Sequence, residues 1–492
     1  MTHLFQFGLT FLLFSAWYTN PSKKILLVLS SFAMGWFCVE TINELGVTKE
    51  LSIHLGIDFL LLGIHLLILQ AFKHLKGSYI LAIGLLFSLV YAHKIVMDRL
   101  ELNPADVPEI LIHFESEDAK VRILKKYEKY ISKKEEIAFD LQSKEVTDLD
   151  DYLTLDIKNN YDPYKILRLI KDNKGVEWIE LNQKIEIPEM IEVPFKNTSK
   201  IDGFSDPLSN QQWNLNVLSV DKMHAKLKSK KPKNKNQVLI AILDTGIDSN
   251  HEDIKAHYKS SGIKSYDSDS KGHGTHCAGI AGAVTGNKVG VASIIPEHLD
   301  IKIMSIQVLN NFGFGTQQSI IAGILKAADL SADVISLSLG GMSSETKEKA
   351  YTKAVEYANK KGAIVVVAAG NSNKNARYYS PANTPGVIAV TSIDSTLKKS
   401  TFANTVDDLE MGVAAPGENI LSTYPDNLYK KFNGTSMAAP YVAGLIAVLN
   451  VYEPDLDTKR AYELLQNNKI NVLGLSGVPV VNPNDIIDQL DH

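Results

Sequence analysis

The sequence predicts an α/β domain built on a parallel sheet with helices on both faces, preceded by a small α+β sandwich and an all-α transmembrane bundle. Three observations support this prediction. The first hundred residues contain long apolar runs, residues 109–181 alternate between short strands and amphipathic helices, and the remainder contains near-continuous apolar strands. Such strands are typical of parallel sheets that are covered on both faces. A chain of 492 residues is long enough for a large catalytic domain with accessory domains.

Composition limits the classes of function. The formal net charge is −5, so the charge balance gives no reason to expect a nucleic-acid partner. Only two cysteines occur, Cys38 and Cys277, and the first lies inside an apolar run. A disulfide framework is therefore excluded as part of the design.

The N-terminal region, residues 1–100, is predicted to form three to four transmembrane helices. Its apolar runs cover residues 4–18, 25–42, 51–72 and 79–97. A spanning helix needs about 20 apolar residues, so the last three runs qualify and the first is marginal. No lysine or arginine precedes the first run, which argues against a cleaved signal peptide. We therefore expect a multi-pass membrane protein with the lipid bilayer as a partner.

The charges of the loops predict the orientation. Two lysine pairs precede the second and fourth runs, whereas the loop between the second and third runs is mainly acidic. The residues are Lys23, Lys24, Lys73 and Lys76 on one side, and Glu40, Glu44 and Glu50 on the other. Because lysine-bearing loops stay in the cytoplasm, everything after Met97 is expected on the extracytoplasmic side.

Three ionisable residues, His54, Asp58 and His65, fall on one face of the third run. His54 and His65 are about 16 Å apart along a helix, so the three cannot bind one metal ion without a second helix. Hydrogen bonding between helices is the favoured interpretation. A proton-responsive or metal-responsive site is the alternative.

The segment after the apolar runs, residues 107–187, is predicted to be the small sandwich. Its stretches are, in order, the strand "EILIHFES", the helix "EDAKVRILKKYEKYIS", the strands "EEIAFDL" and "YLTLDI", the helix "DPYKILRLIKDN" and the strand "VEWIEL". Asp162 is expected to cap the second helix, with Pro163 in its first turn. Residues 188–204 carry prolines and the polar run "KNTSK", and are predicted to be an exposed linker open to proteolysis.

The stretch "GHGTHCAGI" allows two chemical interpretations. His273, His276 and Cys277 could converge on a zinc ion from one helix face. Alternatively, a serine hydrolase would use a single histidine here as its general base. The zinc interpretation leaves several polar residues elsewhere in the chain unexplained, so the second is favoured, with His276 as a structural residue and Cys277 as a packing group.

Those other residues lie where α/β sheets place functional groups. The strand "QVLIAILD" ends at Asp244, "GAIVVVAAGNS" ends near Asn371, and "GTSMAAPYVAGLIAVLN" begins a long apolar helix at Ser436. In a nucleophilic triad, Ser436 attacks a carbonyl, His273 transfers the proton and Asp244 orients the imidazole. The side-chain amide of Asn371 and the backbone N–H of Ser436 are the candidate donors of an oxyanion hole.

The motifs closely resemble the subtilase family of serine proteases. They are "ILDTGID", "HGTHCAG", "SLGG", "AAGNS" and "GTSMAAP", in this order, within residues 205–485. Cys277, together with "NARYYSPANTPGVIAV", is similar to the proteinase K branch. The resemblance implies a serine endopeptidase that works through an acyl-enzyme, acts on proteins or peptides, and needs no cofactor for its chemistry.

The resemblance also implies the substrate-binding residues. Ser338, Leu339 and Gly340 would pair with the substrate backbone, and the segment from Gly313 to Gly315 would form the opposite rim. The pocket for the residue that precedes the scissile bond would be lined by Ala368, Ala369 and Gly370, with Tyr379 near its base. We expect a broad preference for apolar or aromatic residues.

By the same resemblance, the small sandwich is an inhibitor I9-like propeptide. Residues 107–187 would fold as a βαββαβ chaperone and bind as the enzyme's own inhibitor, residues 188–204 would be the processing linker, and residues 205–485 the catalytic domain. Self-cleavage in cis between Ile187 and Phe204 would separate the protease from its membrane anchor.

Departures from the family concern calcium. The loop "AVTGNKVGVAS" is short compared with members that bind calcium there, so that site is not expected. A second family site would use the carbonyls of Pro385 and Val387 and the carboxylate of Glu410, where an aspartate is usual; structural calcium is what the resemblance implies there. Tyr441 replaces a histidine common after the motif proline, and we expect only local packing effects.

Two alternatives remain open at this point. A catalytically idle subtilase fold could serve as a binding or sensing module, although the intact triad argues against it. The membrane helices could also sense a signal and control release of the protease, with His54 and Asp58 as the relevant residues. The physiological substrate is not encoded in any of these patterns.

Overall fold

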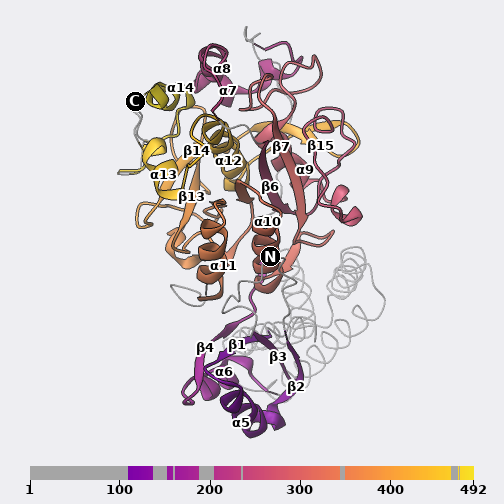
Figure 1. The fold of residues 1–492 in the computed structure, drawn as a ribbon, viewed down its shortest axis with the longest axis vertical. Helices are drawn as coiled ribbons and strands as arrows, with labels where there is room; N and C mark the ends of the chain where they lie inside the picture. Colours follow the sequence, from indigo (N-terminus) through magenta and orange to yellow (C-terminus); the bar gives the residue numbers. More distant parts are fainter. Residues whose placement is uncertain are drawn as a thin grey trace, which may run out of the picture. The chain divides into compact units, whose positions relative to one another are not determined.

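The computed structural model describes residues 109–136, 152–158, 161–187, 204–233, 237–343, 349–466, 472, 475 and 477–491 (Figure 1). The four apolar runs, His54, Asp58, His65 and most of the predicted linker lie outside the described residues. The chain divides into two compact units, Met1–Val107 and Pro108–His492, and everything below belongs to the second.

The small module is a four-stranded antiparallel sheet with two helices. Its strands follow the spatial order β2-β3-β1-β4. They are β1 (Ile110–Phe114), β2 (Ile131–Glu136), β3 (Leu153–Ile157) and β4 (Val176–Leu181). The helices α5 (Glu117–Tyr127) and α6 (Pro163–Lys171) bury Ile123 and Ile166 against Ile110 and Leu155. Alternate strand residues on the opposite face join the core of the larger domain, Trp178 among them.

Local sequence signals account for most of these boundaries. Ser116 caps α5 through the N–H of Ala119, and Asp162 caps α6 through the N–H of Tyr164, as predicted. The first helix is shorter than predicted, because Ile131 and Ser132 belong to β2. Ile131 pairs with Ile157 and the Ser132 hydroxyl donates to the Asp156 carbonyl, so sheet pairing overrides the helical pattern there.

The larger domain is built on a six-stranded sheet whose strands are all parallel. The spatial order is β14-β13-β11-β9-β6-β7. The strands are β6 (Val238–Asp244), β7 (Ile301–Gln307), β9 (Val334–Leu337), β11 (Ile364–Ala368), β13 (Val387–Ile393) and β14 (Gly412–Pro416). Almost every residue of these strands is buried, which is the reason for their continuous apolar character.

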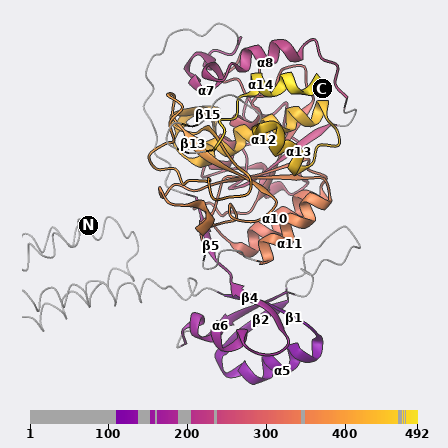
Figure 2. The ribbon, with the colours of Figure 1, turned by 90° about the vertical axis from the view of Figure 1, so that its left-hand side faces the viewer.

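Helices cover both faces of this sheet, as predicted (Figures 1 and 2). Helices α9 (His273–Gly282) and α12 (Thr435–Tyr452) pack on each other and on the strands, and helices α10 (Gln317–Asp329) and α11 (Lys349–Lys360) form a second pair. Helix α12 begins at Thr435, one residue before the predicted start. Within the described part of the chain, α12 alone is long and apolar enough to cross a membrane, but it is entirely buried in this domain.

The remaining elements are short and surround the sheet. The helices are α7 (Trp213–Val217), α8 (Val220–Leu227), α13 (Thr458–Gln466), α14 (Pro483–Ile487), η2 (Glu128–Tyr130), η3 (Ser209–Gln211), η4 (Lys264–Asp267), η5 (Ala376–Tyr378) and η6 (Asp488–Asp491). The strands are β5 (Lys184–Glu186), β8 (Phe314–Thr316), β10 (Gly341–Met342), β12 (Tyr379–Ser380), β15 (Ile420–Tyr424) and β16 (Leu428–Phe432). The β15–β16 hairpin packs on α9, the helix that begins at His273.

Candidate active site

The candidate site lies where several elements end or begin at the carboxyl edge of the parallel sheet. Strand β6 ends at Asp244, helix α9 begins at His273, and helix α12 carries Ser436 in its first turn. Ser338 follows β9 and Asn371 follows β11. Because the strands are parallel, their carboxyl ends meet at one edge, which brings together residues up to 192 positions apart in the chain.

Asp244 and His273 form a buried pair. Nδ1 of His273 lies 2.8 Å from Oδ1 and 2.9 Å from Oδ2 of Asp244. The N–H of Thr245 donates to the same carboxylate at 2.7 Å, which fixes its orientation. Burial by itself lowers the pKa of the His273 imidazole, but the Asp244 carboxylate and the Cys277 sulfur raise it well above its ordinary value. The pair can therefore stabilise an imidazolium.

Ser436 and Ser338 exchange hydrogen bonds. The Ser436 hydroxyl donates to the Ser338 carbonyl at 3.1 Å, and the Ser338 hydroxyl donates to the Ser436 carbonyl at 2.8 Å. Asn371 lies beside them, where its Oδ1 accepts from both the N–H and the hydroxyl of Thr435 at 2.9 Å. Since Oδ1 is held by Thr435, the amide nitrogen of Asn371 is turned away from Thr435 and is available as a donor.

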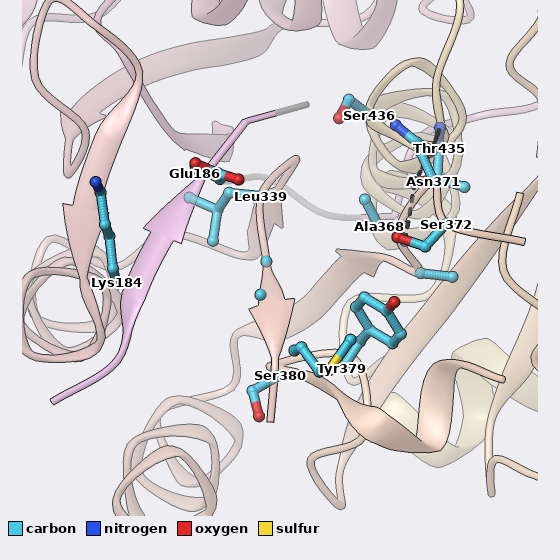
Figure 3. Close-up of a pocket in the computed structure, with 15 residues that line it drawn as sticks. Lys184, Glu186, Leu339, Ala368, Asn371, Ser372, Tyr379, Ser380, Thr435 and Ser436 are labelled. Carbon is cyan, nitrogen blue, oxygen red and sulfur yellow. Dashed lines mark hydrogen bonds between the residues drawn. The ribbon is translucent and has the colours of Figure 1, made fainter. Parts of the chain in front are cut away.

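These residues border a cavity of about 480 Å³ (Figure 3). Ser436 and Asn371 lie at one end, and Tyr379 and Ser380 lie at the other. All four predicted pocket residues line it: they are Ala368, Ala369, Gly370 and Tyr379. Leu339 and Gly340, which were predicted to pair with the substrate backbone, line it as well. Gly370 has φ +99°, and a Cβ there would lie 2.5 Å from Nδ2 of Asn404, so only glycine is accommodated at this wall.

A strand of the chain itself occupies the groove next to this cavity. Strand β5 pairs antiparallel with β8, so that Ile185 lies opposite Gly315 and Glu186 opposite Phe314. On its other side Glu186 forms an antiparallel bridge with Gly340. The N–H of Ile187 donates to the carbonyl of Gly313 at 3.1 Å. The segment that follows the small module thus lies between the two rims that the sequence assigned to substrate.

The isoleucine of this strand and the one that follows it are buried, whereas the charged residues Lys184 and Glu186 are exposed. Ile185 is fully buried and Ile187 is 8 % exposed. A Cβ on Gly341 would lie 3.3 Å from Cδ1 of Ile185, and a Cβ on Gly313 would lie 2.7 Å from Cγ1 of Ile187. These two glycines therefore leave the space that the branched side chains fill.

Polar contacts attach the small module to α10 and α11. The carboxylate of Glu180 accepts from Nε2 of Gln317 at 3.0 Å and from the N–H of Ala350 at 3.2 Å. Asn182 Oδ1 accepts from the N–H of Gln318 at 3.0 Å. Both acceptors face the first turns of helices, whose free N–H groups favour such partners.

The structure separates the three residues of the zinc interpretation. Asp244, His273 and Cys277 have ligand atoms within 4.8 Å of one another, but His276 is not part of this cluster. Nε2 of His276 lies 3.0 Å from the Lys430 carbonyl, and its ring lies 4.7 Å from that of Phe432. Burial lowers the pKa of His276 to about 3. His276 therefore connects α9 to the β15–β16 hairpin, in agreement with the structural role inferred from the sequence.

Sequence reasoning missed an acidic pair around the loop "AVTGNKVGVAS". Asp206 accepts twice from the N–H of Gly286, and Asp253 accepts from Nδ2 of Asn287 at 2.7 Å and from the N–H of Val291 at 2.8 Å. Burial, with a contribution from the Asp206 charge, raises the pKa of Asp253 to about 7. The length of the loop does not predict a cation site here. The signal in the sequence is the set of oxygen ligands, Asp206, Asp253 and Asn287, which lie far apart in the chain.

The other predicted metal residues lie apart from this loop. Val387 begins β13 and is buried, Pro385 is half-buried and Glu410 is exposed just before β14. A calcium site at these three residues stays a prediction. Tyr441 is buried within α12, as expected for a packing position.

Comparison with known proteins gives consistent matches. A family model described as the subtilase family matches residues 235–480, half of the chain. Thermitase of Thermoactinomyces vulgaris is 46 % identical over 215 residues, covering 43 % of this chain and 74 % of that protein. Subtilisin DY of Bacillus licheniformis is 39 % identical over 240 residues, covering 48 % of this chain and 84 % of that protein. A solved protease structure from Pseudoalteromonas arctica aligns with a TM-score of 0.49 and 26 % identity, over 59 % of this chain and all of that one.

Proposed function

The chain belongs to the subtilase family of serine endopeptidases, and we propose that Asp244, His273 and Ser436 perform its peptide-bond hydrolysis in a self-processed, membrane-tethered zymogen. The observation that supports these roles is the buried pair of Asp244 and His273 at 2.8 Å, at the same sheet edge as Ser436 and its cavity. An Asp, His and Ser triad is general to the family.

In the proposed reaction, the Ser436 hydroxyl turns from the Ser338 carbonyl toward His273 and attacks the carbonyl carbon of the substrate. His273 takes the hydroxyl proton and returns it to the leaving amine, which breaks the C–N bond and leaves an acyl-enzyme. Water then attacks the ester carbon while His273 takes its proton. Collapse of this second intermediate breaks the ester C–O bond, returns the proton to Oγ of Ser436 and releases the acid product. Nδ2 of Asn371 and the N–H of Ser436 stabilise the oxyanion in both steps. This chemistry needs no cofactor.

A serine-directed fluorophosphonate tests these roles. Matured wild-type protein is expected to react, whereas Ser436→Ala is expected not to react and to lose peptidase activity by about 10⁶-fold. Labelling of Ser436→Ala at the wild-type rate would contradict the assignment of the nucleophile.

Substrates are proposed to be protein or peptide segments that bind in extended form as an added strand. Support comes from strand β5, which lies between β8 and Gly340 with its backbone paired on both sides. Segments with apolar side chains at alternate positions suit this groove, because Ile185 and Ile187 are the residues buried there. Ser338, Leu339, Gly340 and Gly313 are the proposed backbone-binding residues, and Ala368, Ala369 and Gly370 line the pocket beside Ser436.

We propose that the small module inhibits the catalytic domain until the chain cleaves itself between Ile187 and Phe204. Since β5 fills the substrate groove and Glu180 and Asn182 hold the module to α10 and α11, a substrate would have to displace the strand. N-terminal sequencing of the purified catalytic fragment would identify the cleaved bond. A single full-length band in an active preparation would contradict self-cleavage.

Substitution of the buried strand residue tests inhibition in the full chain. Ile185→Glu introduces a charge at a fully buried position, so the strand should dissociate and the uncleaved precursor should hydrolyse a small chromogenic peptide. Val121→Glu is the matched control, since Val121 is 59 % exposed on α5 of the same module. If Ile185→Glu remains as inactive as the control before cleavage, the groove-filling strand is not the inhibitor.

The membrane tether and the location of the catalytic domain outside the cytoplasm are proposed from residues 1–100, by the lengths of the apolar runs and the lysines that flank them. Full-length Ser436→Ala protein should stay with membranes in alkaline carbonate, and added protease should digest its catalytic domain in cells with an intact cytoplasmic membrane. Digestion only after lysis would reverse the orientation.

A relationship to the proteinase K branch is proposed from Cys277 and the "NARYYSPA" stretch alone.

Structural calcium is proposed at the loop that follows α9. Asp206 is 2 % exposed and Asp253 is fully buried, and two buried carboxylates with an adjacent amide are oxygen ligands suited to calcium. Pro385, Val387 and Glu410 form the weaker candidate site. Neither site takes part in the chemistry of the peptide bond.

A further inference from the structure

Asp269, four residues before His273, accepts an unusually large number of hydrogen bonds for one side chain. Oδ1 accepts from the N–H of Gly272 at 2.8 Å, from the N–H of Lys271 at 3.1 Å and from the hydroxyl of Thr245 at 2.9 Å. Oδ2 accepts from the N–H of Thr275 at 2.9 Å and from its hydroxyl at 2.8 Å. Asp269 is only 6 % exposed. Each oxygen thus faces at least one backbone N–H, which can only donate, and these contacts favour the carboxylate. Burial and the Asp244 charge act in the opposite direction and raise the pKa of Asp269.

These bonds connect the two segments that carry Asp244 and His273. Thr245 follows Asp244 directly, and its hydroxyl donates to Asp269 and accepts from the N–H of Gly274 at 3.1 Å. Gly272 and Thr275 lie on either side of His273 at the start of α9. One buried carboxylate therefore anchors the end of β6 and the first turn of α9 to each other.

The backbones of the two segments are in direct contact. A Cβ on Gly274 would lie 2.1 Å from the carbonyl oxygen of Gly246, and a Cβ on Gly246 would lie 2.0 Å from the carbonyl oxygen of Ser268. Neither glycine can therefore be replaced by a residue with a side chain, and the two segments contact each other through their backbones. Hydrogen bonds therefore help to set the relative position of Asp244 and His273. Asp269 accepts one bond from the Asp244 segment, through Thr245, and four from the residues around His273.

We propose that Asp269 is a positioning residue that holds Asp244 and His273 at the separation needed for proton transfer. The proposal rests on the catalytic roles proposed above for those two residues. Asp269 acts through the backbone and through Thr245, and it touches neither Ser436 nor the groove that holds β5.

The expected consequence of removing the Asp269 charge follows from this geometry. An asparagine can present its oxygen to only one of the two donor sets, and its NH₂ group would face the other set of donors. The Asp244–His273 contact then loosens, so the imidazolium is stabilised less and the pKa of His273 falls. Asp269 is linked to the groove only through Lys271, whose N–H donates to Asp269 and whose Cε would lie 3.7 Å from a Cβ on Gly313. We therefore expect kcat to fall by a larger factor than KM rises.

Asp269→Asn in the full chain, matured and corrected for active sites by titration with a fluorophosphonate, tests the proposal. We expect kcat to fall by about 100-fold, since small misplacements of catalytic groups cost about that much, and the acid limb of kcat/KM to move to lower pH. Asp333→Asn is the matched control: Asp333 accepts from the N–H of Leu239 at 2.7 Å, near the opposite end of β6. The control should keep the wild-type kcat and pH profile.

An unchanged kcat per titrated site, with an unchanged acid limb, would overturn the proposal. If Asp269→Asn does not fold, Thr245→Val and Thr245→Ser decide the question. Val removes the bridging hydroxyl and should lower kcat and shift the acid limb in the same direction, whereas Ser keeps the hydroxyl and should restore both. Equal values for Val and Ser would also overturn the proposal. Activity of His273→Ala at the wild-type level would refute the catalytic assignment itself, whatever Asp269→Asn shows.

Discussion

Nδ1 of His273 lies 2.8 Å from Oδ1 of Asp244, and both side chains are almost completely shielded from solvent. This contact keeps the charged imidazolium favourable in a site that would otherwise disfavour it, because burial alone lowers the pKa of a histidine. The position of the acid limb of the activity profile is therefore set by a balance between burial, which lowers the pKa of His273, and the Asp244 carboxylate and Cys277 sulfur, which raise it.

The first prediction concerns this balance. His273 must be neutral to act as a base, and its pKa is raised, so kcat/KM should rise with pH along a limb centred above the ordinary histidine value of about 6.5. Asp244→Asn removes the charge but keeps the shape. We expect kcat to fall by about 10⁴-fold and the limb to move to lower pH, as measured by kcat/KM from pH 5 to 10. A limb that stays in place would mean that another group controls the titration.

The second prediction concerns Cys277. Its sulfur lies 3.9 Å from Nδ1 of His273 and 3.4 Å from the Ser436 carbonyl, and it is fully buried. A mercurial bound to this sulfur would displace the imidazole, so it should inactivate the wild-type protease. Cys277→Ala should keep most of the activity, at a cost in stability of about 1 kcal/mol for the small cavity, and should resist the mercurial in a peptidase assay.

A zinc chelator provides the complementary control for Cys277. We expect no loss of activity in its presence, since the proposed chemistry uses the histidine as a base. Inactivation of the wild-type protein by the chelator, reversed by zinc, would support a metal bound by Asp244, His273 and Cys277 instead.

The third prediction concerns calcium at Asp206 and Asp253. Removal of calcium at pH 8 should leave two buried negative charges close together, so the Tm of the matured enzyme should fall and should recover when calcium is added. Asp253→Asn removes one of these charges, so its Tm should respond much less to calcium. Glu410→Gln is the control for the second candidate site. An equal calcium response in wild type and Asp253→Asn would exclude the loop as the binding site.

The pH dependence of the calcium response provides a separate check. Because the pKa of Asp253 is raised to about 7 without a cation, protons compete with calcium for this carboxylate. The Tm gain from calcium in the wild-type protein should therefore shrink between pH 8 and pH 6. A gain that does not depend on pH in this range would argue against Asp253 as a ligand.

The fourth prediction concerns stability in acid. Burial lowers the pKa of His224 to about 4, and its Nε2 lies 3.0 Å from the Ile294 carbonyl. Since the unfolded chain binds a proton near pH 6.5 and the folded chain does not, this residue reduces stability as the pH falls from about 6.5 to 4, by about 1 kcal/mol per pH unit. His224→Gln keeps an N–H donor and does not titrate, so its free energy of unfolding should depend less on pH in this window.

Urea unfolding of wild type and His224→Gln, both matured and then inactivated with a fluorophosphonate to prevent autolysis, measures this difference at pH 7 and pH 4.5. Because both proteins contain the other titrating groups, the contributions of those groups cancel in the comparison. Asp253 is one of them, and its raised pKa increases the free energy of unfolding as the pH falls, which is opposite to the effect of His224. If the free energy of unfolding changes with pH by the same amount in both proteins, the pKa of His224 is not lowered in the folded state.

Much of the fold could be predicted because its causes are local in the sequence. Strand β4 has the predicted bounds, and α6 has the predicted cap, because alternation and a capping aspartate act over a few residues. The same holds for the candidate triad, whose members are recognisable from the short motifs around them. Where a non-local contact competes, prediction fails: Ile131 was assigned to a helix but pairs with Ile157 in the sheet.

The sequence by itself therefore determined the α/β class, the separate small module, the family motifs and the residues proposed for chemistry, because each depends on side-chain type and short-range periodicity. Only the tertiary structure decided that β5 lies in the proposed substrate groove, that Asp206 and Asp253 both accept from the loop after α9, and that Asp269 joins the segments of Asp244 and His273. These contacts link segments that follow no common periodic pattern. They arise only when the chain has folded, because tertiary packing brings buried charges and free backbone donors from distant segments within hydrogen-bonding distance.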